Sequence, residues 1–154
     1  MANETVVDID AMTPVIAVHA GSLGALEEAL RNRGADVLRL DGTTIVDQES
    51  LLAGVAADLA PAADAEDMDP GGWDGLNDLL WQLLAARPTD RVALIWTRAD
   101  VLMERSLNDF LMGLNVFGDV SRAVRSTGNG FPRVMQFQVF VLGDAPSFPR
   151  LRGS

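Results

Sequence analysis

The sequence predicts an α/β fold, a small three-layer structure in which a parallel sheet of about four strands is flanked by helices. Four short, largely β-branched runs are nearly continuously apolar instead of alternating, which is typical of strands covered on both faces. Helical patterns separate these runs, and strands that alternate with helices favour a parallel sheet with right-handed crossovers. With 154 residues, 48 % of them hydrophobic, the chain is long enough for one domain with its own core.

The predicted elements follow one another at short intervals. The strands are expected at residues 14–18, 37–40, 92–96 and 138–142. A helix with Ser22 as its N-cap is expected to reach about Arg33, where Gly34 ends it. Further helices are expected over residues 48–59, 72–86 and about 106–126, although two glycines weaken the last of these.

The expected helix over residues 72–86 has two unlike flanks. At about 100° per residue, one flank carries the leucines of a core-facing helix, namely Leu76, Leu79, Leu80 and Leu83. The opposite flank carries Asp74, Asn77, Asp78 and Trp81. A large indole beside two carboxylates is unusual on a flank that only keeps the protein soluble, so this flank is the first candidate for a binding surface.

The chain is strongly acidic. It has 22 acidic residues and 12 arginines, with no lysine, so its formal net charge is −10. Such a field repels phosphate backbones and anionic lipids and attracts a basic partner, so neither nucleic acid nor a membrane is expected to bind. Between Asp58 and Asp78 there are seven acids and no basic residue. A solvated loop followed by an exposed helix face also explains this run.

The composition excludes several classes of protein. There is no cysteine, and therefore no disulfide framework or cysteine metal site. The acidic start of the chain lacks the pattern of a signal peptide, and no apolar run is long enough to span a bilayer. We therefore expect a cytoplasmic protein without a metal or cofactor.

Three catalytic or ligand-binding patterns are present only in part. His19 ends the first expected strand and leads into a glycine-containing turn, but the phosphate-binding fingerprints and a nucleophile elbow are absent. Asp67, Asp69 and Asp78 match positions of a calcium loop, which would have to end inside the helix over residues 72–86. Asp74 and Asp78 have the spacing of a catalytic acid–base pair, but that role needs one carboxylate to be buried, and nothing in the sequence buries either.

Several stretches resemble the barstar family of intracellular ribonuclease inhibitors. Residues 37–45 and 50–61 resemble the family's first strand, turn and first helix, and residues 72–80, GWDGLNDLL, resemble its N-(L/W)-D-A-L-x-D-x-L helix. Residues 92–96 are similar to its strand ending in tryptophan, and residues 137–142 to its last strand. Gly72 stands where the family has asparagine, and Asn77 where it has an aromatic residue.

The resemblance implies a parallel sheet flanked by helices that blocks a nuclease's active site. Residues 36–143 would form the barstar-like domain, residues 1–35 a strand-helix extension packed on the same sheet, and residues 144–154 a flexible tail. Asp74 matches the first motif aspartate of the binding helix and Asp78 the second, which enters the site where substrate phosphate would lie. A carboxylate mimics phosphate as an acceptor for basic groups.

The leading hypothesis is therefore a non-enzymatic inhibitor or immunity protein whose partner is a basic ribonuclease or nuclease toxin. Asp78 would mimic phosphate beside Asp74, and the other expected contacts are Gly72, Asn77, Trp81, Asp67 and Asp69, the last two mainly steering the partner. Trp81 could instead cover the edge of the core. The alternatives are a small α/β enzyme or phosphate-binding domain built on the strand end at His19, and a barstar-like module that binds a basic protein other than a nuclease.

Overall fold

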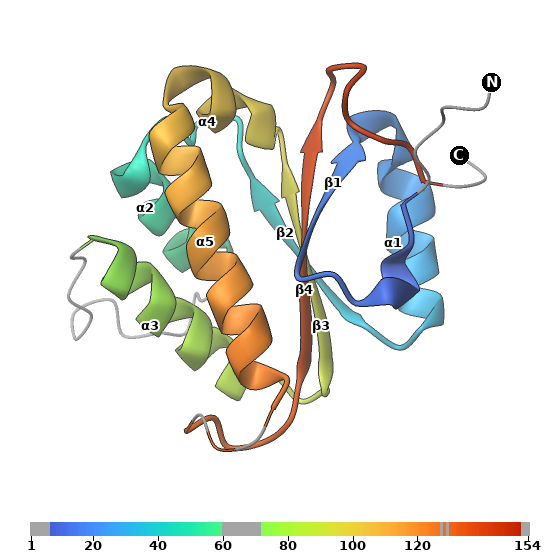
Figure 1. Cartoon of the computed structure of the whole chain (residues 1–154), viewed down its shortest axis with the longest axis vertical. Helices are drawn as coiled ribbons and strands as arrows, with labels where there is room; N and C mark the ends of the chain where they lie inside the picture. Colours follow the sequence, from blue (N-terminus) through green and yellow to red (C-terminus); the bar gives the residue numbers. More distant parts are fainter. Residues whose placement is uncertain (1–6, 60–71, 127, 129, 152–154) are drawn as a thin grey trace.

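The computed structural model describes residues 7–59, 72–126, 128 and 130–151, and it places a four-stranded parallel sheet between two layers of helices (Figure 1). The strands are β1 (Val15–His19), β2 (Asp36–Asp41), β3 (Arg91–Thr97) and β4 (Gln136–Gly143). Their order across the sheet is β1-β4-β3-β2, and all neighbours are parallel. The predicted fold class and all four predicted strands are confirmed.

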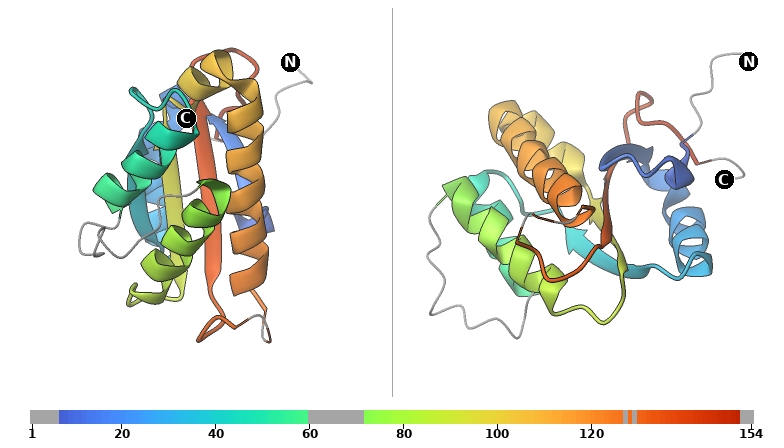
Figure 2. Two further views of the ribbon diagram at one scale, coloured as in Figure 1. Left: turned by 90° about the vertical axis from the view of Figure 1, so that its left-hand side faces the viewer. Right: turned by 60° about the horizontal axis from the view of Figure 1, so that its bottom comes forward.

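Two sets of helices cover the two faces of the sheet. The α-helices of the described residues are α1 (Leu23–Asn32), α2 (Gln48–Leu59), α3 (Gly72–Ala85), α4 (Ala99–Arg105) and α5 (Leu107–Val124), and two short 3-10 helices lie at Ile9–Ala11 and Ala20–Ser22. Helix α1 lies on one face and the other four α-helices lie on the opposite face (Figures 1 and 2). No helix within the described ranges is long and apolar enough to cross a membrane.

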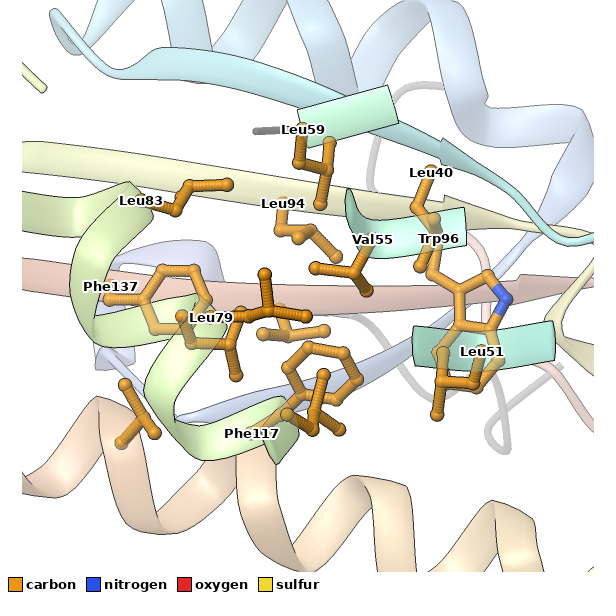
Figure 3. Packing of buried hydrophobic residues seen from close by; sticks show 14 of the residues in the cluster. Leu40, Leu51, Val55, Leu59, Leu79, Leu83, Leu94, Trp96, Phe117 and Phe137 are labelled. Atoms are coloured by element: carbon orange, nitrogen blue, oxygen red, sulfur yellow. The ribbon is translucent and has the colours of Figure 1, made fainter. Parts of the chain in front are cut away.

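The central strands are apolar on both faces because each face has its own core. In β3, Leu94 and Trp96 belong to the larger core beneath α2, α3 and α5, where Trp96 lies among residues such as Leu51 and Phe117 (Figure 3). Ile95 points the other way, into the smaller core beneath α1. Because both faces of such a strand are buried, successive side chains are all apolar instead of alternating between apolar and polar, which explains the continuous apolar runs in the sequence.

Strand β1 extends the sheet at one edge. It pairs with β4 in parallel, from Val15 opposite Val139 to His19 opposite Gly143, and it has no other partner strand among the described residues. The connection through α1 then carries the chain across the smaller core to β2 at the opposite edge. The described residues up to 35 therefore contribute an edge strand and the helix that covers the second face, within the same sheet as the rest of the chain.

One α-helix was not predicted. Helix α4 precedes α5, and the extended backbone of Ser106, with φ −153° and ψ 89°, separates the two. The Ser106 hydroxyl accepts a hydrogen bond from the Asp109 amide at 3.4 Å and so caps α5. The seven residues of α4 span only two turns, which is too short for a clear apolar periodicity.

The last described residues pack onto the N-terminal part of the chain, within the stretch for which the sequence predicted a flexible tail. Phe148 is buried, and the carbonyl of Pro149 accepts a hydrogen bond from the His19 amide at 2.8 Å. Ser22 precedes α1 as predicted, but its hydroxyl accepts from the amide of Leu151 at 3.1 Å instead of capping the helix. The serine thus fixes the C-terminal segment, a role that depends on a contact 129 positions away.

Candidate functional site

Helix α3 presents the two flanks that its sequence predicts. Its inward flank is buried against the larger core, and the residues on it are Gly75, Leu76, Leu79, Leu80, Leu83 and Leu84. Asp74 and Asp78 are exposed on the outward flank, one turn apart, and Asn77 beside them is partly buried. The helix is held by its leucines, and its acidic flank takes no part in that packing.

The two carboxylates are available to a partner. Neither the Asp74 nor the Asp78 side chain makes a hydrogen bond or an ion pair with another described residue. The acids of the described ion pairs lie elsewhere, at Asp10, Glu27, Asp36, Asp90, Asp100 and Asp119. In the part of the chain that the structure describes, arginines thus pair with acids elsewhere, and the carboxylates of α3 have no arginine partner.

The net charge of the chain comes from the stretch of sequence that contains this helix. Between Arg39 and Arg87 there is no basic residue, and the ten acids of this segment are Asp41, Asp47, Glu49, Asp58, Asp64, Glu66, Asp67, Asp69, Asp74 and Asp78. The rest of the chain holds twelve acids and twelve arginines, so this segment accounts for the net charge of −10. Helices α2 and α3 lie side by side (Figure 1), so the carboxylates that they carry, Glu49, Asp58, Asp74 and Asp78, contribute to a common negative field.

Trp81 lies at the border between the acidic flank and the core. It is partly buried, it packs against the larger core, and its ring centroid lies 5.0 Å from that of Phe131 at an interplanar angle of 58°. This tilted arrangement is favourable for an aromatic pair. The indole thus both covers the core edge and remains partly accessible beside Asp78, so the two interpretations of its role are not exclusive.

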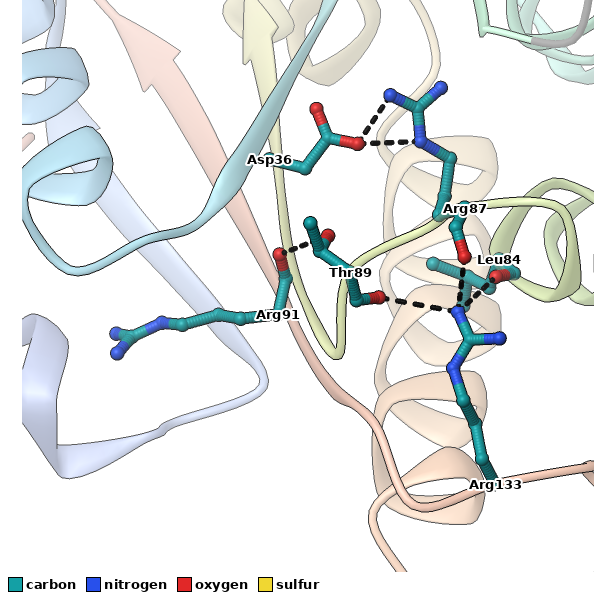
Figure 4. A network of polar contacts seen from close by, with 6 residues as sticks. All are labelled: Asp36, Leu84, Arg87, Thr89, Arg91 and Arg133. Atoms are coloured by element: carbon teal, nitrogen blue, oxygen red, sulfur yellow. Dashed lines mark hydrogen bonds and ion pairs between the residues drawn. The ribbon is translucent and has the colours of Figure 1, made fainter.

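The segment that brings Phe131 to α3 is anchored by Arg133. Its Nη2 donates to the carbonyl of Leu84 at 3.5 Å, to that of Thr89 at 3.2 Å, and to that of Arg87 (Figure 4). Its Nε lies 3.1 Å from Asp90 Oδ1. One guanidinium therefore satisfies carbonyls at and just after the end of α3 and fixes residues 130–134 against it.

The sequence did not assign Phe131 to the site, because it lies fifty positions from Trp81. One signal was available in the sequence. A single aromatic residue stands in the otherwise polar stretch STGNGFPR, residues 126–133, and a phenylalanine in such a loop indicates that the loop packs on another part of the protein.

Backbone conformation explains the glycine that begins α3. Gly72 has φ +67°, in the left-handed region that glycine adopts without strain and asparagine tolerates better than most residues. Trp73, next along the helix, packs inward on the larger core, close to Gly113 of α5. A Cβ on Gly113 would lie 3.1 Å from Leu51 and 3.8 Å from the Trp73 ring, so this glycine lets α5 approach both helices closely.

Two expected site residues, Asp67 and Asp69, lie outside the described residues, as does most of the suggested calcium loop. Asp78, which would complete that loop, is inside α3. Among the residues that the structure describes, no three histidine or acidic side chains gather closely enough to hold a metal ion.

The strand end at His19 is occupied by the chain itself. The Nδ1 atom accepts from the Gly21 amide at 2.9 Å, and Nε2 lies 3.1 Å from the carbonyl of Asp144. Nearby, Asp100 is buried and its Oδ2 accepts from the Asp144 amide at 3.2 Å. A Cβ on Gly21 would lie 2.7 Å from the Arg150 guanidinium, so this turn is closely covered. The His19 ring nitrogens and the Gly21 amide, which a bound phosphate or a catalytic histidine would need, are thus already in hydrogen-bond contact within the chain.

Comparison with known proteins assigns no family. No protein-family model and no curated protein matches the chain. A chain in the structure of Drosophila ORC bound to AT-rich DNA and Cdc6 is similar with a TM-score of 0.47 and 15 % sequence identity. The similarity covers 91 % of this chain but only 43 % of that chain, so this chain spans less than half of its length. At this identity and score the likeness bears on neither family nor function.

Proposed function

We propose that this chain is a cytoplasmic inhibitor, of the immunity-protein kind, that binds a basic secreted ribonuclease or a related nuclease toxin and blocks its active site with α3. The observation that carries the proposal is the outward flank of α3, where Asp74 and Asp78 are exposed and unpaired among the described residues. Ribonuclease active sites hold basic groups that bind substrate phosphate. A carboxylate fixed on a helix offers those groups a matching acceptor.

The arrangement of elements supports the proposal. The stretches that resemble the barstar family fall, in chain order, on β2, α2, α3, β3 and β4. Gly72, which replaces the family's asparagine, has a positive φ that both residue types accept. Trp96 at the end of β3 is fully buried in the core, as a structural tryptophan at that place would be.

In the proposed complex each residue of the flank has a distinct task. Asp78 takes the place of substrate phosphate, and Asp74 is its charged neighbour one turn earlier. Asn77, with its partly buried side chain, supplies a hydrogen bond, and Gly72 is a backbone contact at the start of the helix. Trp81 is an apolar anchor. Asp67 and Asp69 contribute to the field that steers the partner. The chain performs no chemistry of its own.

The test is inhibition of RNA cleavage by a panel of basic secreted bacterial ribonucleases that includes barnase and those of the source organism. Asp78→Ala should raise the concentration for half-inhibition roughly 30-fold or more, because it leaves basic groups of the partner buried and unpaired. Glu28→Ala is the matched control, since it removes one exposed helical carboxylate from α1, on the opposite face of the sheet. If the parent inhibits no member of the panel, or if both variants inhibit equally well, the proposal is wrong.

Ionic strength provides a second readout. The association rate of the parent with an inhibited ribonuclease should fall as salt is added, since the acids between residues 40 and 86 steer the encounter. A complex that formed equally fast in low and high salt would contradict this steering.

A further inference from the structure

The outward flank of α3 does not end at the helix. Phe131, from the segment between α5 and β4, lies against Trp81 with ring centroids 5.0 Å apart. Both rings are only partly buried and both pack on the larger core from its rim. The two residues therefore form a single apolar spot, drawn from two distant parts of the chain, next to the exposed carboxylate of Asp78.

This spot is held in place before any partner arrives. Arg133 fixes the segment to the end of α3 through three carbonyls, and its Nε faces Asp90. Two backbone hydrogen bonds then tie the segment to its neighbours, from the Met135 amide to the Val124 carbonyl at 2.8 Å and from the Gln136 amide to the Asp90 carbonyl at 2.7 Å. A surface fixed in this way loses little conformational entropy on binding.

Its position matches that of an interface anchor. Aromatic residues are frequent among the residues that dominate binding energy, and such residues lie within a rim of polar groups that exclude water. Here the rim includes Asp74 and Asp78, which are exposed and carry no described ion pair. A carboxylate rim selects a partner whose own apolar contact is bordered by basic side chains.

We propose that the docking surface of this protein extends from α3 onto residues 130–134, with Trp81 and Phe131 as one shared apolar anchor, and that its occupant is an apolar patch framed by lysine or arginine on the ribonuclease. This inference rests on the proposed function. Arg133 is a positioning residue in this arrangement, because it holds Phe131 in place without touching the partner.

The experiment measures binding kinetics with the ribonuclease that the parent inhibits best. Phe131→Ala should raise the dissociation rate roughly tenfold, as expected for the loss of an aromatic anchor, and leave the salt dependence of association unchanged. Asp78→Ala should instead change both rates, because its charge acts at long range as well as in contact.

Leu107→Ala is the matched control. Leu107 is 55 % exposed, and on α5 it lies about 200° around the helix from Asp109, which accepts a hydrogen bond from the Gln48 amide of α2. It therefore points away from the layer of α2 and α3, and its loss should leave both rates unchanged.

Because Phe131→Ala could also loosen the core rim, the parent complex is examined by hydrogen exchange. The amides of residues 130–134 should gain protection on binding, while those of α1 should not. The inference is overturned if the parent binds and Phe131→Ala dissociates at the parental rate, or if residues 130–134 gain no protection. A parent that binds no ribonuclease refutes the proposed function instead, and the inference falls with it.

Discussion

Replacing Arg133 with methionine should destabilise the fold by about 2 kcal/mol. The guanidinium donates to the carbonyls of Leu84, Arg87 and Thr89 and faces Asp90 at 3.1 Å. A hydrogen bond from a charged donor contributes roughly 1.5–3 kcal/mol net, and a cation beside the last carbonyls of a helix adds roughly 0.3–1 kcal/mol. Since the Arg133 side chain is 32 % exposed, solvent screening places the total near the lower end of that range.

Urea denaturation measures this loss as a lower midpoint with an unchanged slope. For a chain of this length, about 2 kcal/mol corresponds to a fall of roughly 4–8 °C in Tm. Methionine keeps most of the aliphatic stem, so the polar contacts are what the substitution removes. Arg122→Met is the matched control, because Arg122 is 61 % exposed and its ion pair is with Asp119 on its own helix; it should change the stability by less than about 0.5 kcal/mol. Equal stability of the two variants would refute the role assigned to Arg133.

Two further predictions concern Asp47, which precedes α2, and Gly42, which follows β2. The hydroxyl and amide of Ser50 donate to Asp47 at the start of α2 and hold the pKa of that carboxyl below its ordinary value of 3.8. The stability that Asp47 adds is therefore fully present above pH 3.8 and lost as the pH falls through the lower folded value. The difference in stability between the parent and Asp47→Asn in urea denaturation should therefore shrink below about pH 4. A difference that stays constant down to pH 2 would exclude a stabilising role of the Asp47 charge. Gly42→Ala should destabilise the fold by roughly 1–3 kcal/mol in thermal unfolding, because the added Cβ would lie 2.3 Å from the Thr97 carbonyl oxygen. The control is Gly24→Ala in α1, where the added Cβ meets nothing within 4 Å and should stabilise the fold by roughly 0.5–1 kcal/mol. Similar effects of the two substitutions would contradict the close approach at Gly42.

Most of the fold follows from local patterns. The strands were predictable because a strand buried on both faces, such as β3, is apolar at successive positions. Helix α3 was predictable because its leucines recur at helical spacing and a proline follows it. Helix α4 was not, because seven residues do not establish a period.

The candidate site was predictable only on the helix itself. The exposure of Asp74 and Asp78 follows from their angular distance from the leucines of α3. The degree to which Trp81 is buried does not, because it is set by Phe131 and the core edge. The same holds for Ser22, which has the composition of a helix cap but accepts a hydrogen bond from Leu151.

The sequence by itself determined the α/β class, the four strands, the inward and outward flanks of α3, and the concentration of negative charge between Arg39 and Arg87. These properties depend on residues close together along the chain, where helix and strand periods fix which side chains share a face. Only the tertiary structure decided that β1 pairs with β4, that the last described residues pack on the strand end at His19, and that Phe131 lies beside Trp81. Each of these is a contact between distant segments, and its free energy comes from burial and hydrogen bonds that form only after the sheet has brought those segments together.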